Sequence, residues 1–301
     1  MTELATATAT QPKALHRASA WLHRRPKLRL GMLLGPPMAW MLVVYLGALT
    51  LLFLTGFWSQ NVLTAEVQRT WGLENYQEIL SSAAYRTIAL RTLGIAFAVM
   101  ITDIILALPV AYFAARVARP TTRVLLLLSI TLPLWSSYLV RVYAWRVILS
   151  GTGLLNWTLG KLQLGALDIE YSNWSVWIVF SYLWLPFVAL PIYTALERVP
   201  TSYIEASADL GARWWLTFRR VLLPIAFPGI VAGAMFAFAL TLGDYIVPIL
   251  AGNTLFIGNV IYQSVGVANN VPFAAAYAVV PAVIMGVYLI GARKLGAFEA
   301  L

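Results

Sequence analysis

Six apolar segments, each long enough to cross a lipid bilayer, dominate this 301-residue chain. They lie at roughly 31–57, 88–115, 124–149, 174–196, 227–250 and 274–294. A transmembrane helix needs about 20 apolar residues, because the hydrocarbon core is about 30 Å thick. Only 11% of the residues are charged, whereas a soluble domain has about 25%. The sequence therefore predicts an all-α membrane protein with six transmembrane helices in a lipid bilayer.

Positive charge alternates between the connectors of these segments, which predicts the topology. Most Lys and Arg residues lie in the N-terminal tail, after the second segment, after the fourth segment and after the sixth. The other connectors hold few cations and most of the acidic residues. Cytoplasmic connectors are rich in Lys and Arg. We therefore expect both termini and the connector between the fourth and fifth segments to be cytoplasmic.

Residues 1–30 form a basic segment before a transmembrane domain that covers residues 31–301. We expect a mostly disordered cytoplasmic tail, with a transit peptide as the alternative because the segment is basic and poor in acids. The apolar run that follows is too long for a cleaved signal peptide. The formal net charge of +9 reflects topology, so no nucleic-acid partner is expected.

Several kinds of chemistry are missing from the sequence. There is no Cys, and both His residues, His16 and His23, lie in the basic tail. No P-loop pattern G-x-x-x-x-G-K-[ST] and no nucleophile motif is present. We therefore expect no enzyme activity, no cofactor and no metal site. If ATP drives this protein, another polypeptide hydrolyses it.

The polar stretch from Val199 to Pro224 interrupts the apolar C-terminal half. Its first part has helical character, and Gly211 is expected to end or bend that helix because Gly tolerates a positive φ. Glu205-Ala206-Ser207, Gly211 and Val221-Leu222-Leu223-Pro224 follow a fixed spacing. An ordinary amphipathic loop helix is the alternative interpretation.

This spacing resembles the EAA loop of the permeases of ABC importers, with Ser207 in place of the second Ala and Val221 in place of Ile. The resemblance implies a coupling helix from Tyr203 to Leu210 between spans 4 and 5, in a groove of a cytoplasmic ATPase. Glu205 would be its polar contact and Gly211 the bend that sets its angle. The implied ATPase-coupling residues are Tyr203, Glu205, Ala206, Ser207, Asp209, Gly211, Leu223 and Pro224.

Charged residues also lie within the spans, at Asp103, Arg141, Arg146 and Asp244. A charge at mid-membrane costs about 2.5–3.5 kcal/mol on insertion scales, so each needs a partner or a wet cavity. Asp244 lies between Gly243 and Pro248, which favours a locally opened helix. Asp244 and Arg141 either face a transported solute or pair with each other or with a neighbouring subunit.

The residues around these charges sharpen the resemblance. Leu132-Pro133-Leu134-Trp135, Arg141 to Trp145 and Leu242 to Tyr245 resemble the third- and fifth-span motifs of the spermidine/putrescine-type permeases. A cationic solute would suit carboxylates with aromatic neighbours. The implied substrate path contains Asp103, Trp135, Tyr138, Arg141, Trp145, Asp244 and Tyr245.

The resemblance implies a permease subunit of an ATP-driven importer in the inner membrane of a bacterium. Its implied partners are a second permease subunit, which would make a heterodimer, two cytoplasmic ATP-binding subunits, and a periplasmic or lipid-anchored solute-binding protein. Polyamines or related amine compounds are the implied solutes. One alternative is a secondary transporter driven by an ion gradient, although no internal repeat supports it. A membrane anchor or sensor without transport is the other.

Smaller signals concern helix packing and the connectors. Gly229, Gly233 and Ala234 favour close helix approach in the fifth span. Residues 58–86 are long enough for a short interfacial helix, and residues 150–173 predict a loop with a helical turn. Prolines are expected to interrupt several spans, where neighbours satisfy the freed carbonyls. They are Pro109, Pro133, Pro186, Pro191, Pro248 and Pro281.

Overall fold

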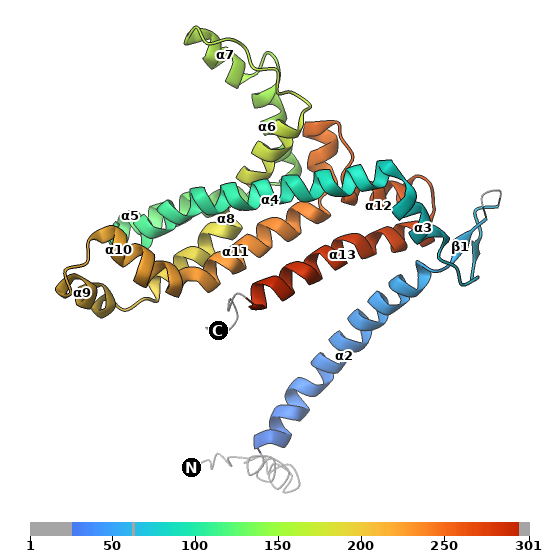
Figure 1. Cartoon of the computed structure of the whole chain (residues 1–301), viewed down its shortest axis with the longest axis horizontal. Coiled ribbons are helices and arrows are strands. Elements are labelled where there is room, and N and C mark those ends of the chain that lie inside the picture. The colour runs from blue at the N-terminus through green and yellow to red at the C-terminus, as the bar shows by residue number, and fades with distance from the viewer. Residues whose placement is uncertain (1–25, 62–63, 295–301) are drawn as a thin grey trace, which may run out of the picture. The chain divides into compact units, whose positions relative to one another are not determined.

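The computed structural model describes residues 26–61 and 64–294, and these are mostly helical (Figure 1). The chain divides into two compact units, residues 1–54 and 55–301. The described part of the first unit is α2 (Pro26–Thr55) up to Leu54, which covers most of the first predicted span. Residues 1–25, and with them most of the predicted disordered tail, lie outside the described residues.

The second unit contains four long apolar helical stretches and one bent pair of helices. Ala83–Val117 comprises α4 (Ala83–Tyr112) and the π-turn η1 (Phe113–Val117). The other three are α8 (Asn173–Glu197), Trp214–Gly243 and α13 (Val271–Lys294). Trp214–Gly243 contains α10 (Trp214–Thr217), the π-turn η3 (Phe218–Leu222) and α11 (Leu223–Gly243). With α2, the described residues thus hold five candidate spans, or six if the bent pair is one span.

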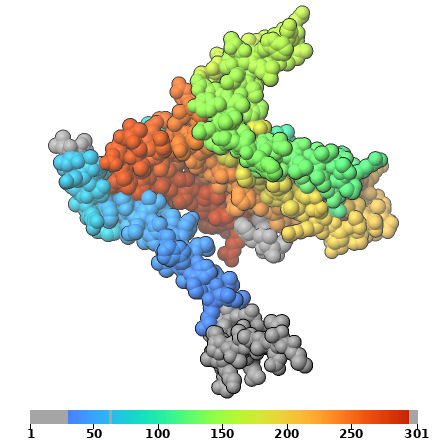
Figure 2. Space-filling view, turned by 180° about the vertical axis from the view of Figure 1, so that it is seen from behind, coloured from blue at the N-terminus to red at the C-terminus, as the bar shows by residue number. Residues whose placement is uncertain are grey.

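The bent pair occupies the place of the third predicted span. Pro120–Trp135 consists of α5 (Pro120–Thr131) and the 3-10 turn η2 (Leu132–Trp135); Tyr138–Lys161 consists of α6 (Tyr138–Leu149) and α7 (Leu154–Lys161). The two halves meet at 99°. Ser136 and Ser137 are extended, with ψ of 155° and 137°, directly after the turn that contains Pro133. The interruption predicted at Pro133 is therefore present within the segment predicted at 124–149, and it takes the form of a sharp bend between two helices. Figure 2 shows α6 and α7, in green, projecting from the rest of the second unit.

The core of the second unit lies where α4, α8 and α11 pack together (Figure 1). A Cβ added at Gly229 would lie 2.4 Å from the Cβ of Ala195 and 2.7 Å from the carbonyl oxygen of Pro191. At Gly233 it would lie 2.9 Å from the carbonyl oxygen of Val188. Only glycine permits this separation of α8 and α11, so the predicted close approach is confirmed.

A second cluster joins α3 (Glu74–Ser81), α4, α12 (Ile257–Gly266) and α13 around Tyr277. The short helix predicted in residues 58–86 is present as α3, and the helical turn predicted in residues 150–173 is the eight-residue helix α7. An antiparallel pair of short strands, β1 (Ser59–Gln60) and β2 (Val67–Gln68), was not predicted. The remaining elements are α9 (Thr201–Asp209) and the π-turn η4 (Pro248–Gly252).

Candidate functional site

Helix α9 connects α8 to α10 and presents its residues to the surface. None of its residues is buried, and it begins two residues before the coupling helix expected at Tyr203. The side chain of Tyr203 is 54% exposed and that of Leu210, just after the helix, is 89% exposed. Glu205 and Asp209 are also exposed. A helix with so little burial is available for a partner protein.

Gly211 ends α9 in the manner expected from the sequence. Its φ is 77°, and its N–H donates to the carbonyl of Ala208 at 2.8 Å. The N–H of Ala212 donates to the carbonyl of Ser207 at 3.1 Å. These two bonds with a left-handed residue form a Schellman motif. A Cβ at Gly211 would meet no atom within 4 Å, so glycine is required by the backbone conformation rather than by space.

The chain after Gly211 is anchored to the end of α4 by aromatic side chains. The indole N–H of Trp214 donates to the hydroxyl of Tyr112 at 2.9 Å. The Tyr112 ring also packs edge-on against Trp214 and Phe218, with ring centroids 5.9 Å apart in both pairs. Tyr112 lies 102 residues before Trp214, and sequence reasoning did not identify it.

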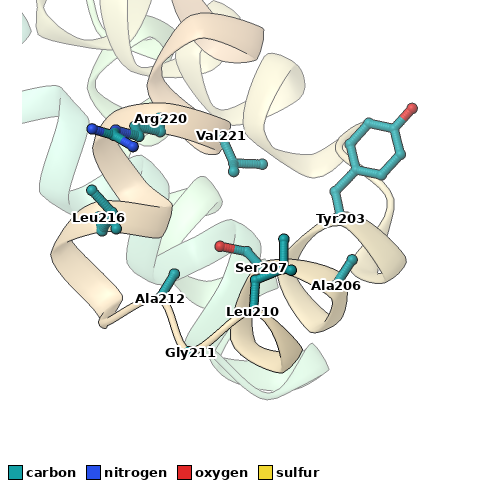
Figure 3. A pocket seen from close by; sticks show the side chains of 9 residues that line it. All are labelled: Tyr203, Ala206, Ser207, Leu210, Gly211, Ala212, Leu216, Arg220 and Val221. Carbon is teal, nitrogen blue, oxygen red and sulfur yellow. The ribbon is translucent and has the colours of Figure 1, made fainter.

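A pocket of about 510 Å³ lies between α9 and η3 (Figure 3). Four predicted coupling residues line it, namely Tyr203, Ala206, Ser207 and Gly211, together with Leu210, Ala212, Leu216, Arg220 and Val221. Leu216 and Arg220 face the α9 side chains across the opening in Figure 3. Leu223 and Pro224 begin α11 and do not line this pocket.

Two arginines hold the neighbouring helix ends. Arg116 donates to the carbonyls of Leu196 and Val199, the latter at 2.5 Å. Arg123 lies 3.3 Å from a carboxylate oxygen of Glu197. Cationic side chains at helix C-termini satisfy carbonyls that lack an intrahelical partner. In the sequence these arginines indicated topology alone, because Leu196, Val199 and Glu197 lie more than 70 residues away from them.

Asp244 lies at a break after α11, as its neighbours Gly243 and Pro248 predicted. Its backbone is extended, with ψ of 135°. The Oδ1 atom accepts the N–H groups of Ile246 at 2.8 Å and Val247 at 2.9 Å. Asp244 therefore caps the turn that leads into η4. Gly258 of α12 packs on the break, since a Cβ there would lie 2.7 Å from the Asp244 carbonyl oxygen.

Tyr138, the first residue of α6, holds the other oxygen of this carboxylate. Its hydroxyl donates to Oδ2 of Asp244, and its ring stacks on Trp184 with centroids 6.1 Å apart. The Arg141 guanidinium lies 5.9 Å from the centre of the Tyr138 ring. Within the described residues no ion pair joins Arg141 to Asp244, and the buried Nε of Arg141 has no hydrogen-bond partner there. The direct pair considered from the sequence is absent, and Tyr138 contacts both residues instead.

Tyr245 extends this site with an aromatic surface. It stacks on Tyr262 of α12, with centroids 4.4 Å apart and an interplanar angle of 9°. Both side chains are partly exposed, at 37% and 49%. Asn259 fixes the arrangement by donating to the Tyr245 carbonyl at 2.5 Å. Stacked tyrosines beside a carboxylate suit an ammonium group. Tyr262 and Asn259 were missed because their connector showed only an uncharged stretch.

The other predicted path residues lie elsewhere. Asp103 is fully buried in α4, and neither its carboxylate oxygens nor the hydroxyl of the neighbouring Ser181 has a hydrogen-bond partner among the described residues. Trp145 packs on Tyr182 with centroids 5.2 Å apart, and Trp135 is 88% exposed at the bend. No hydrogen bond or ring contact in the described chain links these three to Asp244. The same part of the chain contains no group of acidic or His side chains that could hold a metal ion.

Comparison with known proteins identifies the class of protein. The chain belongs to the family of inner membrane components of binding-protein-dependent transport systems, whose model matches residues 97–293. It is a multi-pass permease subunit of an ABC transporter in the bacterial inner membrane and is not itself an enzyme. Such importer permeases work with an ATPase and a substrate-binding protein.

Individual relatives cover most of the chain. It is 41% identical to the inner membrane ABC transporter permease protein YdcU of Escherichia coli (strain K12), over 95% of this chain and 96% of the relative. It is 33% identical to the spermidine/putrescine transport system permease protein PotB of the same strain, over 74% and 82%. A crystal structure of a bacterial alginate ABC transporter has the same fold, with a TM-score of 0.70 at 16% identity, covering 93% of this chain and 98% of the other.

Proposed function

We propose that this permease subunit forms part of the translocation path for a polyamine or a related cationic amine. The observation that carries the proposal is the carboxylate of Asp244, which lies at the break after α11 and directly precedes Tyr245 of the exposed Tyr245–Tyr262 stack. An ammonium group gains from an anion and from the face of an aromatic ring. The similarity to PotB, a spermidine/putrescine permease, supports the same class of solute.

Tyr138 gives this carboxylate an uncharged hydrogen-bond donor. A buried carboxylate needs hydrogen-bond donors, and Asp244 has the Tyr138 hydroxyl and two backbone N–H groups. None of these three donors carries a formal positive charge. A cationic solute would therefore supply the charge partner that the described residues lack.

The same proposal assigns α9 to the ATPase. Its exposed Tyr203, Glu205 and Leu210 would contact a cytoplasmic ATP-binding subunit, and Gly211 would set the angle of the helix. The proposed assembly has six spans in this chain with both termini in the cytoplasm. It also contains a second, different permease subunit, two ATP-binding subunits, and a periplasmic or lipid-anchored binding protein. ATP-driven approach of the ATPases would move α9 and switch access to the path.

Membership in this family argues against a secondary transporter driven by an ion gradient. Such a transporter has no need of an exposed helix for an ATPase. In addition, Asp103 and Asp244 show no hydrogen bond or shared cluster in the described chain that would form a paired carboxylate site. The ATP-driven importer accounts for both α9 and the Asp244 site.

Asp244→Asn tests the solute site. The amide oxygen can still accept the N–H groups of Ile246 and Val247, so the local fold should persist while the charge is lost. Hydrogen bonds to charged groups contribute about 1.5–3 kcal/mol, so we expect uptake of radiolabelled putrescine or spermidine to fall about tenfold or more. Uptake is measured in vesicles that contain the full complex, with basal ATPase activity as a check on assembly.

Asp168→Asn is the matched control, because Asp168 is exposed in the connector before α8. It should transport like the unchanged complex. Normal uptake by Asp244→Asn would remove this residue from the path. Loss of assembly or of basal ATPase activity would assign Asp244 a structural role, and the proposed solute site would then be wrong.

A further inference from the structure

A pair of hydroxyl groups joins α9 to the helix that follows it. The Oγ atom of Ser207 and the Oγ1 atom of Thr217 are 2.9 Å apart. Thr217, the last residue of α10, is 6% exposed, and Ser207 is half-buried. Ser207 is also the position at which this chain departs from the Ala of the EAA pattern. The departure introduces a hydrogen-bonding group at a site where Ala has none.

This contact matters because few contacts hold α9 in place. The helix has no buried residue, and its apolar contact with the main core is made by the partly buried Ile204. The Schellman motif fixes the direction of the chain at its end. Among the described residues, the bond to Thr217 is the one side-chain hydrogen bond that α9 makes. The orientation of α9 about its own axis therefore depends on two side chains, Ile204 by apolar packing and Ser207 by hydrogen bonding.

Helix α10 is in turn attached to two long helices. It runs through η3 into α11, so a displacement of Thr217 is passed directly to the helix that ends before Asp244. Three residues before Thr217, the indole of Trp214 donates to Tyr112 at the end of α4. The four-residue helix α10 is thus hydrogen-bonded on one side to α9 and on the other side to α4.

We propose that Ser207 and Thr217 are positioning residues for coupling, and that their hydrogen bond makes α9 and α10 move as one body. This inference rests on the proposed contact between α9 and the ATPase. A movement imposed on α9 then reaches α4 and α11 together. Without the bond α9 can rotate or tilt about Gly211, and part of the movement is lost before it reaches the spans.

The test compares two substitutions of Thr217, one that removes the hydroxyl and one that keeps it. Thr217→Val keeps the branched shape and removes the hydroxyl, whereas Thr217→Ser keeps the hydroxyl and removes a methyl group. A neutral hydrogen bond contributes about 0.5–1.5 kcal/mol, so we expect Thr217→Val to lower the ratio of solute-stimulated to basal ATPase activity about fivefold. Thr217→Ser should keep that ratio. Both are measured in the full complex, together with solute transported per ATP.

Ser207→Ala provides the same test at a half-buried position, in case Thr217→Val impairs assembly. It should reproduce the loss of coupling, and the double variant should be no worse than either single variant because one bond is removed in all three. Normal coupling in Thr217→Val and Ser207→Ala would overturn the proposal. Equal loss in Thr217→Ser and Thr217→Val would also overturn it, since shape rather than the hydroxyl would then matter.

Gly211→Leu separates this inference from the proposed function on which it rests. If Gly211→Leu uncouples ATP hydrolysis while the hydroxyl variants do not, α9 couples as proposed and the hydroxyl pair has no positioning role. If Gly211→Leu also leaves coupling intact, the assignment of α9 as the coupling helix is wrong.

Discussion

Replacement of Gly211 by leucine should uncouple ATP hydrolysis from the solute without damaging the membrane domain. Gly211 has φ of 77°, and an L-residue pays about 1–2 kcal/mol for that conformation. An added Cβ would meet no atom within 4 Å, so this conformational cost is the main effect. A difference of one to two kcal/mol changes a population about 5–30-fold. The bent conformer that places α9 should therefore lose most of its population.

The assay is solute-stimulated ATPase activity of the full complex in vesicles, relative to its basal activity. Gly211→Asn is the matched control, because asparagine has nearly the size of leucine but tolerates the left-handed conformation. We expect Gly211→Leu to insert and assemble normally, and its stimulated activity to fall several-fold. Gly211→Asn should retain most of the stimulation.

Two results would refute this reasoning. Stimulation in Gly211→Leu equal to that of the unchanged complex would show that the bend is not needed for coupling. Equal loss in the leucine and asparagine variants would show that the surface at this position matters, rather than its backbone conformation.

Two further predictions concern topology and packing. Single Cys residues in place of Lys161 and Arg213 should differ in labelling by a membrane-impermeant thiol reagent in intact cells. Lys161→Cys should react and Arg213→Cys should not. The reverse pattern would contradict the proposed topology. Gly229→Leu should prevent the approach of α11 to α8, since its Cβ would lie 2.4 Å from that of Ala195. Overpacking costs about 1–3 kcal/mol, so the melting temperature of the Gly229→Leu protein in detergent should be well below that of Gly286→Leu. At Gly286 an added Cβ meets no atom within 4 Å. Equal melting temperatures would show that the crossing of α8 and α11 is not tight.

Features that depend on local sequence could be predicted. The apolar segments follow from length and composition, and the end of α9 follows from Gly211, because both depend on residues that are close in the chain. The opening at Asp244 was visible from Gly243 and Pro248 for the same reason. Gly229 and Gly233 predicted the close crossing, although the partner helix α8 could not be named from them.

Features that depend on contacts between distant parts of the chain could not be predicted from the sequence. Tyr138 and Asp244 are 106 residues apart. The sequence favoured Arg141 as the partner of Asp244, because their charges are opposite. The position of Pro133 predicted an interruption, but the 99° bend depends on how α6 packs on α8 and η4. The connector with Asn259 and Tyr262 has no charge, and nothing local to it indicates that it packs against the Asp244 site, which lies earlier in the chain.

The break after α11 has a mechanical consequence. Gly243 ends one helical piece, and residues 246 and 247 begin the next with their own cap on Oδ1 of Asp244. If the second piece swings at this break, no hydrogen bond inside the first piece has to be broken. The other oxygen of the same carboxylate holds Tyr138. One carboxylate thus connects the start of the second piece to α6, so a cation that displaced this carboxylate would disturb both contacts together.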